Sequence, residues 1–273
     1  MNEETFEVEK KDLDAEYFQI GIIGTNTTAK SLEHAFKYKP RNDVMVVDNI
    51  NKHLEDLIEF EPNITFLCNE VKETDEGIVD AAELEDCLLQ LSGKTNSGMV
   101  IKTSLPMSLV ERSCKNKKVV YNPDLFFRSE DIDTRLNRPF SILGGNPGST
   151  MAIAEIYHRF STMNCGHYHH VSPVEACFIE QAIGSIMVMK SVFFSQLYDT
   201  VREFGGDYHT IQNIISNDLR IGGYGGRVPN TDGTYGENNK QAIKAMNSLK
   251  QFSDRFTILE NCGIMNDRYQ ERD

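Results

Sequence analysis

The residues best placed to do chemistry begin at a short turn near the N-terminus. The apolar run FQIGII at residues 18–23 predicts a buried strand, followed by a turn and a helix. A dinucleotide-binding turn of the form G-x-G-x-x-G/A lets the backbone approach a pyrophosphate at its second glycine. Here the three places hold Gly24, Asn26 and Ala29. Asn26 therefore puts a side chain where the phosphate would approach.

Asp48 is the second candidate of this kind. It closes the apolar run at residues 44–47, which predicts a second strand. In dinucleotide sites an acidic residue at this place accepts hydrogen bonds from the adenosine ribose. The alternative is that Asp48 only ends a strand. Because strand, helix and acid are all in place, NAD is a candidate cofactor even though the turn is weakened.

The elements that position these residues alternate along the first part of the chain. Predicted strands at 18–23, 44–47, 64–68, 98–102, 119–121 and 141–143 are separated by predicted helices at 27–38, 54–60, 78–91, 106–115 and 150–163. This alternation predicts the α/β class, with a Rossmann-like doubly wound parallel sheet and helices on both of its faces.

The pattern changes after Pro173. Residues 174–204 predict one long helix that ends at Gly205-Gly206, and apolar residues surround much of it. Such a helix needs partners on more than one side, so it suits a connector that also forms a homodimer interface. Further helices are predicted at 208–216 and 238–256.

Three parts of the chain follow from this pattern. They are an acidic N-terminal arm at 1–16, a Rossmann-like dinucleotide-binding domain at 17–173 and an all-helical central or dimerisation domain at 174–273.

Charge and composition restrict the partners. A net charge of −13 repels the phosphate backbone, so a nucleic-acid partner is not expected. No stretch reaches the roughly 18 apolar residues that span a bilayer, and the N-terminus lacks the order of a signal peptide. The six cysteines are scattered without a CxxC pair, as in a cytoplasmic protein with reduced thiols.

Three further segments carry longer motifs. Residues 100–106 read VIKTSLP, residues 121–128 read YNPDLFFR, and residues 218–249 contain DLRIG, VPNTDG and GENNKQAIKA. They resemble the motifs V-I-K-S-T-x-P, N-P-E-F-L-x-E, D-P-R-I-G, V-P-G-P-D-G and G-G-x-C-F-P-K-D of the UDP-glucose/GDP-mannose dehydrogenases, a family of nucleotide-sugar dehydrogenases. Residues 175–199 are similar to the central helix of that family. The chain looks like a short form that lacks the C-terminal UDP-binding domain.

This resemblance implies an NAD-dependent oxidation of a sugar alcohol to a carboxylate. A Cys thiolate traps the intermediate aldehyde, a Lys and an Asn from the central helix polarise the reacting oxygen, and acids handle protons and water. Other residues hold most of these places here. Gln241 stands for the Cys, Glu180 for the Lys, Gly184 for the Asn, Ala245 for the following Asp, and Asp124 and Arg128 for the two Glu, whereas Lys244 and the hydroxyl at Ser104 are kept.

The replacements are incompatible with the family's chemistry. The amide of Gln241 is not a nucleophile, so no thioester can form. Glu180 would place a negative charge beside a developing alkoxide. Glu180 and Arg128 could instead form a structural ion pair. Cys177 lies one helical turn before Glu180 and is the one thiol that could stand in for the missing Cys.

Two further groups of polar residues are weaker candidates. Arg220, Arg227 and Lys244 could contact a phosphate of a nucleotide-sugar substrate, although a surface loop that keeps its turn chemistry explains the first two equally. His167, His169 and His170 form a cluster, but no Cys or carboxylate at suitable spacing completes a metal site. An exposed strand end, and no metal, is expected there.

Three hypotheses remain open from the sequence. The protein is a catalytically degenerate, dimeric pseudoenzyme with a binding or structural role. Alternatively, it is a working NAD-dependent oxidoreductase with altered chemistry. In the third hypothesis it is an NAD-responsive regulator that has lost turnover.

Overall fold

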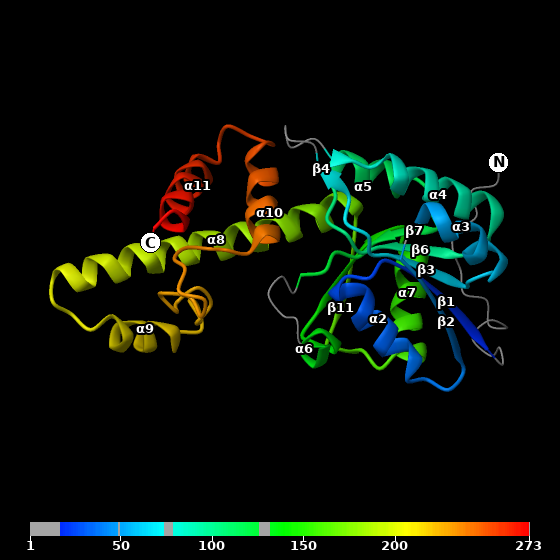
Figure 1. Ribbon diagram of the computed structural model, residues 1–273, viewed down its shortest axis with the longest axis horizontal. Helices are drawn as coiled ribbons and strands as arrows, with labels where there is room; N and C mark the ends of the chain where they lie inside the picture. Colours follow the sequence, from blue (N-terminus) through cyan, green and yellow to red (C-terminus); the bar gives the residue numbers. More distant parts are fainter. Residues whose placement is uncertain (1–16, 49, 74–78, 126–131, 273) are drawn as a thin grey trace. The chain divides into compact units, whose positions relative to one another are not determined.

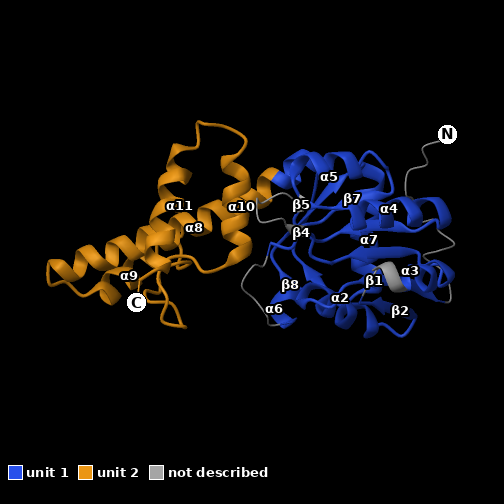
Figure 2. Ribbon diagram, turned by 45° about the horizontal axis from the view of Figure 1, so that its top comes forward, with its two compact units in different colours: residues 1–177 blue, residues 178–273 orange. Residues whose placement is uncertain are grey.

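The computed structural model describes residues 17–48, 50–73, 79–125 and 132–272. The chain divides into two compact units, residues 1–177 and 178–273 (Figure 2). The division falls inside the long helix that the sequence places at the start of the second domain.

Unit 1 is built on a seven-stranded sheet. The strand order is β11-β9-β7-β6-β3-β1-β2, and every neighbouring pair is parallel except β7 and β9. The strands are β1 (Phe18–Ile23), β2 (Asn42–Val47), β3 (Ile64–Leu67), β6 (Gly98–Ile101), β7 (Val119–Tyr121), β9 (Ser141–Gly145) and β11 (Tyr168–Val171). The predicted α/β class with a mostly parallel sheet is confirmed.

Helices cover both faces of this sheet (Figure 1). One face is covered by α2 (Thr27–Lys37) and α7 (Pro147–Phe160), whose buried aromatic and aliphatic residues share a core with β1 and β3. The other face is covered by α3 (Ile50–Glu59), α4 (Ala82–Lys94) and α5 (Met107–Ser113). The remaining short elements of this unit are β4 (Lys72–Glu73), β5 (Val79–Asp80), α6 (Ile132–Leu136), β8 (Asn137–Arg138) and β10 (Asn164–Cys165).

The core of unit 1 explains why α2 forms where it does. Its buried residues Ala29, Leu32 and Phe36 recur at helical spacing and face the sheet. Phe36 packs beside Phe66 and Tyr157, with ring centroids 5.3 Å and 6.2 Å away. The carboxyl ends of β1, β2 and β3 are thereby fixed at one edge of the sheet, where doubly wound folds place their ligands.

The second unit is helical, as predicted. Its elements are α8 (Pro173–Glu203), α9 (Tyr208–Ser216), α10 (Lys240–Lys250) and α11 (Thr257–Gln270), of which α8 begins in unit 1. The prediction of a single helix at 238–256 was wrong at its end, because the chain leaves α10 after Lys250 and forms α11. A core of Val188, Val192, Ala242, Met246, Leu249, Leu259 and Cys262 joins α8, α10 and α11.

In the described part of the chain, α8 is long and apolar enough to cross a membrane by length and composition. Its best 18-residue window has a mean hydropathy of 1.4, but 50% of that window is buried. The buried residues of α8 include Glu180, Gln181, Ser185, Ser191 and Ser195, and a lipid-facing helix would not carry so many polar side chains inward against its own protein. The burial of α8 and its buried polar side chains are typical of a core helix.

Candidate functional site

The turn between β1 and α2 is built around Gly24. Gly24 has a φ of +125°, and a Cβ there would lie 2.7 Å from Asn69 Oδ1 and 3.2 Å from the Cys68 backbone. Both the backbone conformation and the lack of space require glycine. The first place of the predicted fingerprint therefore has a backbone role here.

Asn26, at the second place, caps α2. Its Oδ1 accepts a hydrogen bond from the Ala29 N–H at 3.0 Å, and its Nδ2 donates to the Cys68 carbonyl at 2.6 Å. The side chain is thus held at both ends, between the start of α2 and the residue that follows β3. A helix N-terminus of this kind receives the pyrophosphate in dinucleotide sites. Here the side-chain amide of Asn26 already occupies one of the N–H groups at the N-terminus of α2.

A carboxylate also lies at the first turn of α2. Thr28 Oγ1 donates to Asp124 Oδ2 at 2.8 Å, and the Arg135 guanidinium forms an ion pair with the same carboxylate. Burial alone would raise the pKa of Asp124, but the positive charges of Lys102 and Arg135 hold it below the usual value. Asp124 is therefore an ionised group that faces the start of α2 from inside the protein.

Lys102, Asn122 and Tyr157 form a buried polar cluster that the sequence analysis did not single out. Lys102 Nζ donates to Asn122 Oδ1 at 2.9 Å, and the Tyr157 hydroxyl donates to the same oxygen at 2.8 Å. The Asn122 amide donates to the carbonyl of Ile142 at 2.7 Å. The cluster ties the ends of β6 and β7 to β9 and α7. A signal was present, because Lys102 ends one predicted strand and Asn122 directly follows another.

Removing the buried ammonium is expected to change the pH dependence of stability. Burial lowers the pKa of Lys102 from 10.5 to about 8. Between these values the unfolded chain binds a proton that the folded protein does not, so stability rises with pH across this window. We therefore compare the free energies of unfolding of the wild type and Lys102→Met at each pH. The difference, wild type minus variant, should increase with pH by up to about 1.4 kcal/mol per pH unit. Urea titrations from pH 8 to 10.5 measure it.

The matched control is Lys94→Met, because Lys94 is exposed near the end of α4. Its stability should follow the wild type at every pH. Parallel curves for Lys102→Met and the wild type would show that Lys102 stays charged in the folded protein throughout the window.

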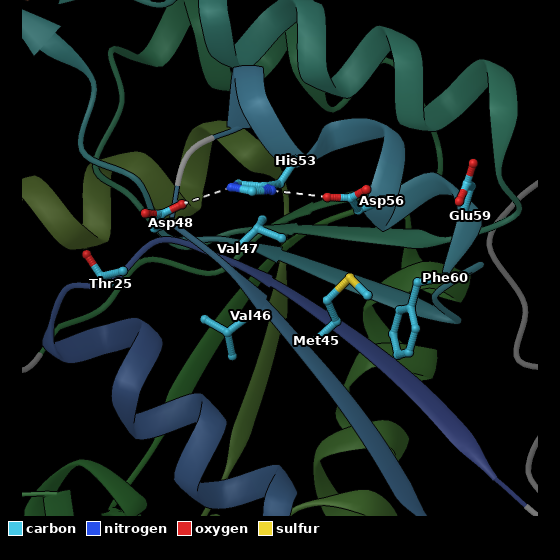
Figure 3. Close-up of a pocket in the computed structure, with 9 residues that line it drawn as sticks. All are labelled: Thr25, Met45, Val46, Val47, Asp48, His53, Asp56, Glu59 and Phe60. Carbon is cyan, nitrogen blue, oxygen red and sulfur yellow. Dashed lines mark hydrogen bonds and ion pairs between the residues drawn. The ribbon is translucent and has the colours of Figure 1, made fainter.

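Asp48 lies in a pocket beside the sheet edge (Figure 3). The pocket has a volume of about 680 Å³ and is lined by Thr25, Met45, Val46, Val47, Asp48, His53, Asp56, Glu59 and Phe60. The His53 ring lies between two carboxylates, with Nδ1 3.0 Å from Asp56 Oδ2 and Nε2 3.7 Å from Asp48 Oδ1. Thr25 and Asp48 follow the neighbouring parallel strands β1 and β2. The fold thus places Asp48, the acidic residue predicted to bind a ribose, beside the turn between β1 and α2.

In unit 2, helices α8 and α10 approach each other at two positions that the resemblance assigns to catalysis. A Cβ added to Gly184 would lie 2.6 Å from the Ala245 Cβ and 3.2 Å from the Ala242 carbonyl oxygen. Gly184 and Ala245 are both buried. The space of the expected Asn and Asp side chains is therefore filled by helix packing.

The other replaced positions have different surroundings. Gln241 is exposed in the first turn of α10, where the side chain of Asn239 caps the helix by accepting from the N–H groups of Gln241 and Ala242. Glu180 is buried on α8, Lys244 is half-buried on α10, and Ser104 is half-buried after β6. Arg128 lies outside the described residues, so its proposed pairing with Glu180 stays a prediction.

The thiol that could stand in for the missing Cys is inaccessible. Cys177 is 1% exposed and lies on the buried side of α8. Cys262, on α11, is also buried, and burial raises its pKa to about 11. Both observations disfavour a reactive thiolate.

The loop between α9 and α10, residues 217–239, contains a buried carboxylate that sequence reasoning missed. Glu237 is fully buried and accepts hydrogen bonds from Ser191 Oγ at 2.8 Å and from the Tyr224 hydroxyl at 3.0 Å. A Glu in a polar loop carries no sign of burial in the sequence. Two of the three predicted phosphate contacts are exposed on this loop: Arg220 is paired with Asp218 at 2.6 Å, and Arg227 lies further along.

The histidine cluster lies where an exposed strand end was expected. His169 and His170 are exposed on β11, at an edge of the sheet, and His167 directly precedes this strand. Among the described residues, no group of three His, Cys, Asp or Glu side chains is arranged to hold a metal ion.

Comparisons with known proteins agree with this architecture. No family model and no curated protein sequence matches the chain. Among solved structures, the chain is similar to UDP-D-ManNAc dehydrogenase from Pyrococcus horikoshii, with a TM-score of 0.71, 13% identity and coverage of 92% of this chain and 69% of that one. It is also similar to a UDP-glucose dehydrogenase from Pyrobaculum islandicum, with a TM-score of 0.69, 16% identity and coverage of 93% and 68%.

A third similar structure is 3-hydroxyisobutyrate dehydrogenase from Mycobacterium tuberculosis, with a TM-score of 0.66, 7% identity and coverage of 94% of this chain and 96% of that one. At these identities the likeness establishes the fold. The chain shares its fold with these dehydrogenases, and it spans about two thirds of the nucleotide-sugar enzymes and nearly all of the hydroxyacid enzyme. In this fold α8 is a core helix.

The residues present fit only one part of an NAD molecule. Asp48 and its pocket suit a ribose diol, because an exposed carboxylate accepts hydrogen bonds from hydroxyl groups. At the pyrophosphate position, Asn26 and Asp124 already satisfy groups of the first turn of α2. A pyrophosphate would have to displace the Asn26 amide from this turn.

Proposed function

We propose that this protein is a catalytically degenerate nucleotide-sugar dehydrogenase homologue that acts by binding and not by turnover. The observation that carries the proposal is the contact of α8 with α10. Gly184 and Ala245 pack so closely that neither position has space for the amide or carboxylate that the oxidation uses. A catalytic pocket cannot coexist with that contact.

The charges and nucleophiles support the same conclusion. Glu180, on α8, carries the opposite charge from the Lys that polarises the reacting oxygen in the family. Gln241 supplies no thiolate, and the sequence contains no cysteine between Cys177 and Cys262. Loss of the nucleophile, of the cation and of the space between the helices are three separate obstacles to turnover.

The test is a direct assay of NAD reduction. Purified protein is incubated with NAD and, separately, with UDP-glucose, UDP-ManNAc or GDP-mannose, while the absorbance of the reduced nicotinamide is followed. We expect no rate above a buffer control, alongside an active nucleotide-sugar dehydrogenase as the positive control. A reproducible rate that scales with protein concentration would refute the proposal and favour an oxidoreductase with altered chemistry.

A regulator that senses NAD is the second candidate. It is favoured by one observation, the position of Asp48 in an open pocket at the end of β2. Binding to the native state raises the thermal midpoint, so a thermal shift with NAD alone tests it. An unchanged midpoint at millimolar NAD would eliminate this candidate.

We further propose that two copies pair through α8. Ile186 and Phe193 are each 56% exposed and lie two helical turns apart on one face of this helix, with the half-buried Ile179, Ile183 and Met189 beside them. An apolar stripe of this length on a core helix is typical of an interface between copies.

Introducing charge on this stripe is expected to give a monomer. In light-scattering chromatography the wild type should elute at twice the chain mass of 31.0 kDa, and Ile186→Glu combined with Phe193→Glu should elute at the chain mass itself. Leu219→Glu is the matched control, because Leu219 is 99% exposed and lies outside α8. A wild type that elutes as a monomer would contradict the proposal.

A further inference from the structure

The pocket beside β2 has the ribose end of a dinucleotide site but lacks the pyrophosphate end. Thr25 and Asp48 lie at its mouth, after two neighbouring parallel strands, as in sites that hold a ribose (Figure 3). The pocket volume of about 680 Å³ lies within the range of small-molecule sites.

The pyrophosphate end is closed by two side chains of the protein. The Asn26 amide bridges the Ala29 N–H and the Cys68 carbonyl, so both polar groups that border the turn are satisfied internally. The Asp124 carboxylate accepts from the Thr28 hydroxyl and supplies the negative charge that a helix N-terminus favours. A phosphate would have to displace the Asn26 amide and to compete with the Asp124 carboxylate for the Thr28 hydroxyl.

The charge of the pocket also disfavours phosphate. Its described lining includes the carboxylates of Asp48, Asp56 and Glu59 and no Lys or Arg side chain. The one basic group in that lining is the His53 ring, which lies between two of the carboxylates. Hydroxyl groups donate to such carboxylates, whereas a phosphate meets like charge.

The opposite wall of the pocket is apolar. Met45 and Val47 line it along β2, and the Phe60 ring lies at the far end in Figure 3. An apolar wall with an aromatic ring suits the flat face of a nucleobase. The lining therefore offers a surface for a base beside a carboxylate for a diol.

We propose that this pocket binds a nucleoside with free ribose hydroxyls and without a 5′-phosphate, in place of a dinucleotide. The ribose diol donates to Asp48, the 5′-hydroxyl lies toward Thr25, and the base lies along β2. This inference rests on the proposed binding role and names the class of ligand for it. It assigns Asn26 the role of an internal substitute for the phosphate.

Calorimetric titration with adenosine, AMP and NAD tests the proposal. The wild type should bind adenosine, and AMP and NAD should each bind at least about tenfold more weakly. Asp48→Ala should weaken adenosine binding at least about tenfold. Asp43→Ala is the matched control, because Asp43 is an exposed carboxylate at the other end of the same strand and does not line the pocket. It should bind adenosine as the wild type does.

A gain-of-binding variant tests the role of Asn26. Asn26→Gly restores the second glycine of the turn and should strengthen NAD binding at least about tenfold while leaving adenosine binding unchanged. Circular dichroism verifies that each variant is folded.

The outcomes separate this inference from the proposed function. A wild type that binds AMP or NAD as tightly as adenosine, or that does not bind adenosine, would overturn the inference and leave the absence of turnover untouched. Reduction of NAD in the presence of a nucleotide sugar would overturn both.

Discussion

Gly184→Ala is expected to destabilise the protein by about 1–3 kcal/mol, the usual cost of overpacking a tight core. The added methyl group would lie 2.6 Å from the Ala245 Cβ, so α8 and α10 must separate. A helical glycine replaced by alanine gains roughly 0.5–1 kcal/mol from backbone entropy, which is smaller than the cost of overpacking. Urea denaturation monitored by circular dichroism measures the net effect.

A control substitution at another helical glycine and a second substitution on α10 accompany this measurement. Gly93 lies near the end of α4 with nothing within 4 Å of an added Cβ, so Gly93→Ala should be neutral or stabilising. Ala245→Gly introduced beside Gly184→Ala removes the facing methyl group and should recover part of the loss, with a coupling of about 0.5–3 kcal/mol. Additive effects of the two substitutions would show that the helices are not in tight contact.

The expected result bears on the proposed function as well as on stability. If an alanine is not tolerated at position 184, an asparagine is tolerated less, because its amide extends further toward α10. Gly184→Asn should therefore destabilise the protein without creating activity. Under the proposed function, the loss of turnover is then part of the packing of unit 2, and restoring a single residue does not reverse it.

Asp124→Asn is expected to cost about 3–5 kcal/mol, the range for removing one partner of a buried ion pair. The side chains of Asp124 and Arg135 are 12% and 9% exposed, so the substitution removes a charge partner from a buried guanidinium. Asn keeps the shape and one oxygen for Thr28, and the loss therefore reports on charge. Urea denaturation at neutral pH measures it, with Asp133→Asn on the exposed side of α6 as the control.

The pH dependence of this difference follows from the lowered pKa. The ordinary Asp value is 3.8, and the folded protein holds the pKa of Asp124 below it. Its contribution is therefore present above pH 3.8 and is lost as the pH falls through the folded-state pKa. The wild type and Asp124→Asn should converge in stability under these acid conditions. A constant difference down to low pH would mean that the charge of Asp124 does not stabilise the fold.

The sequence by itself determined the architecture. The buried strands read as apolar runs because both faces of a parallel sheet are covered, and the alternation with helical spacing leaves few other folds. Gly24 and Asp48 were predictable because a turn with positive φ and a strand end each restrict the residue type locally. The absence of a cysteine between Cys177 and Cys262 was visible as well, since a missing thiol is a property of the sequence alone.

Only the tertiary structure decided what the replaced positions do. The contact between Gly184 and Ala245 joins two helices that are distant in the sequence, and no local pattern reports the distance between them. The same holds for Asn26, whose amide donates a hydrogen bond to the carbonyl of Cys68, the residue after β3. It also holds for the buried Lys102 and Glu237, whose partners come from other elements. Hydrogen bonds and close packing depend on positions in space, whereas the periodicity of a sequence reports only which face of an element is covered.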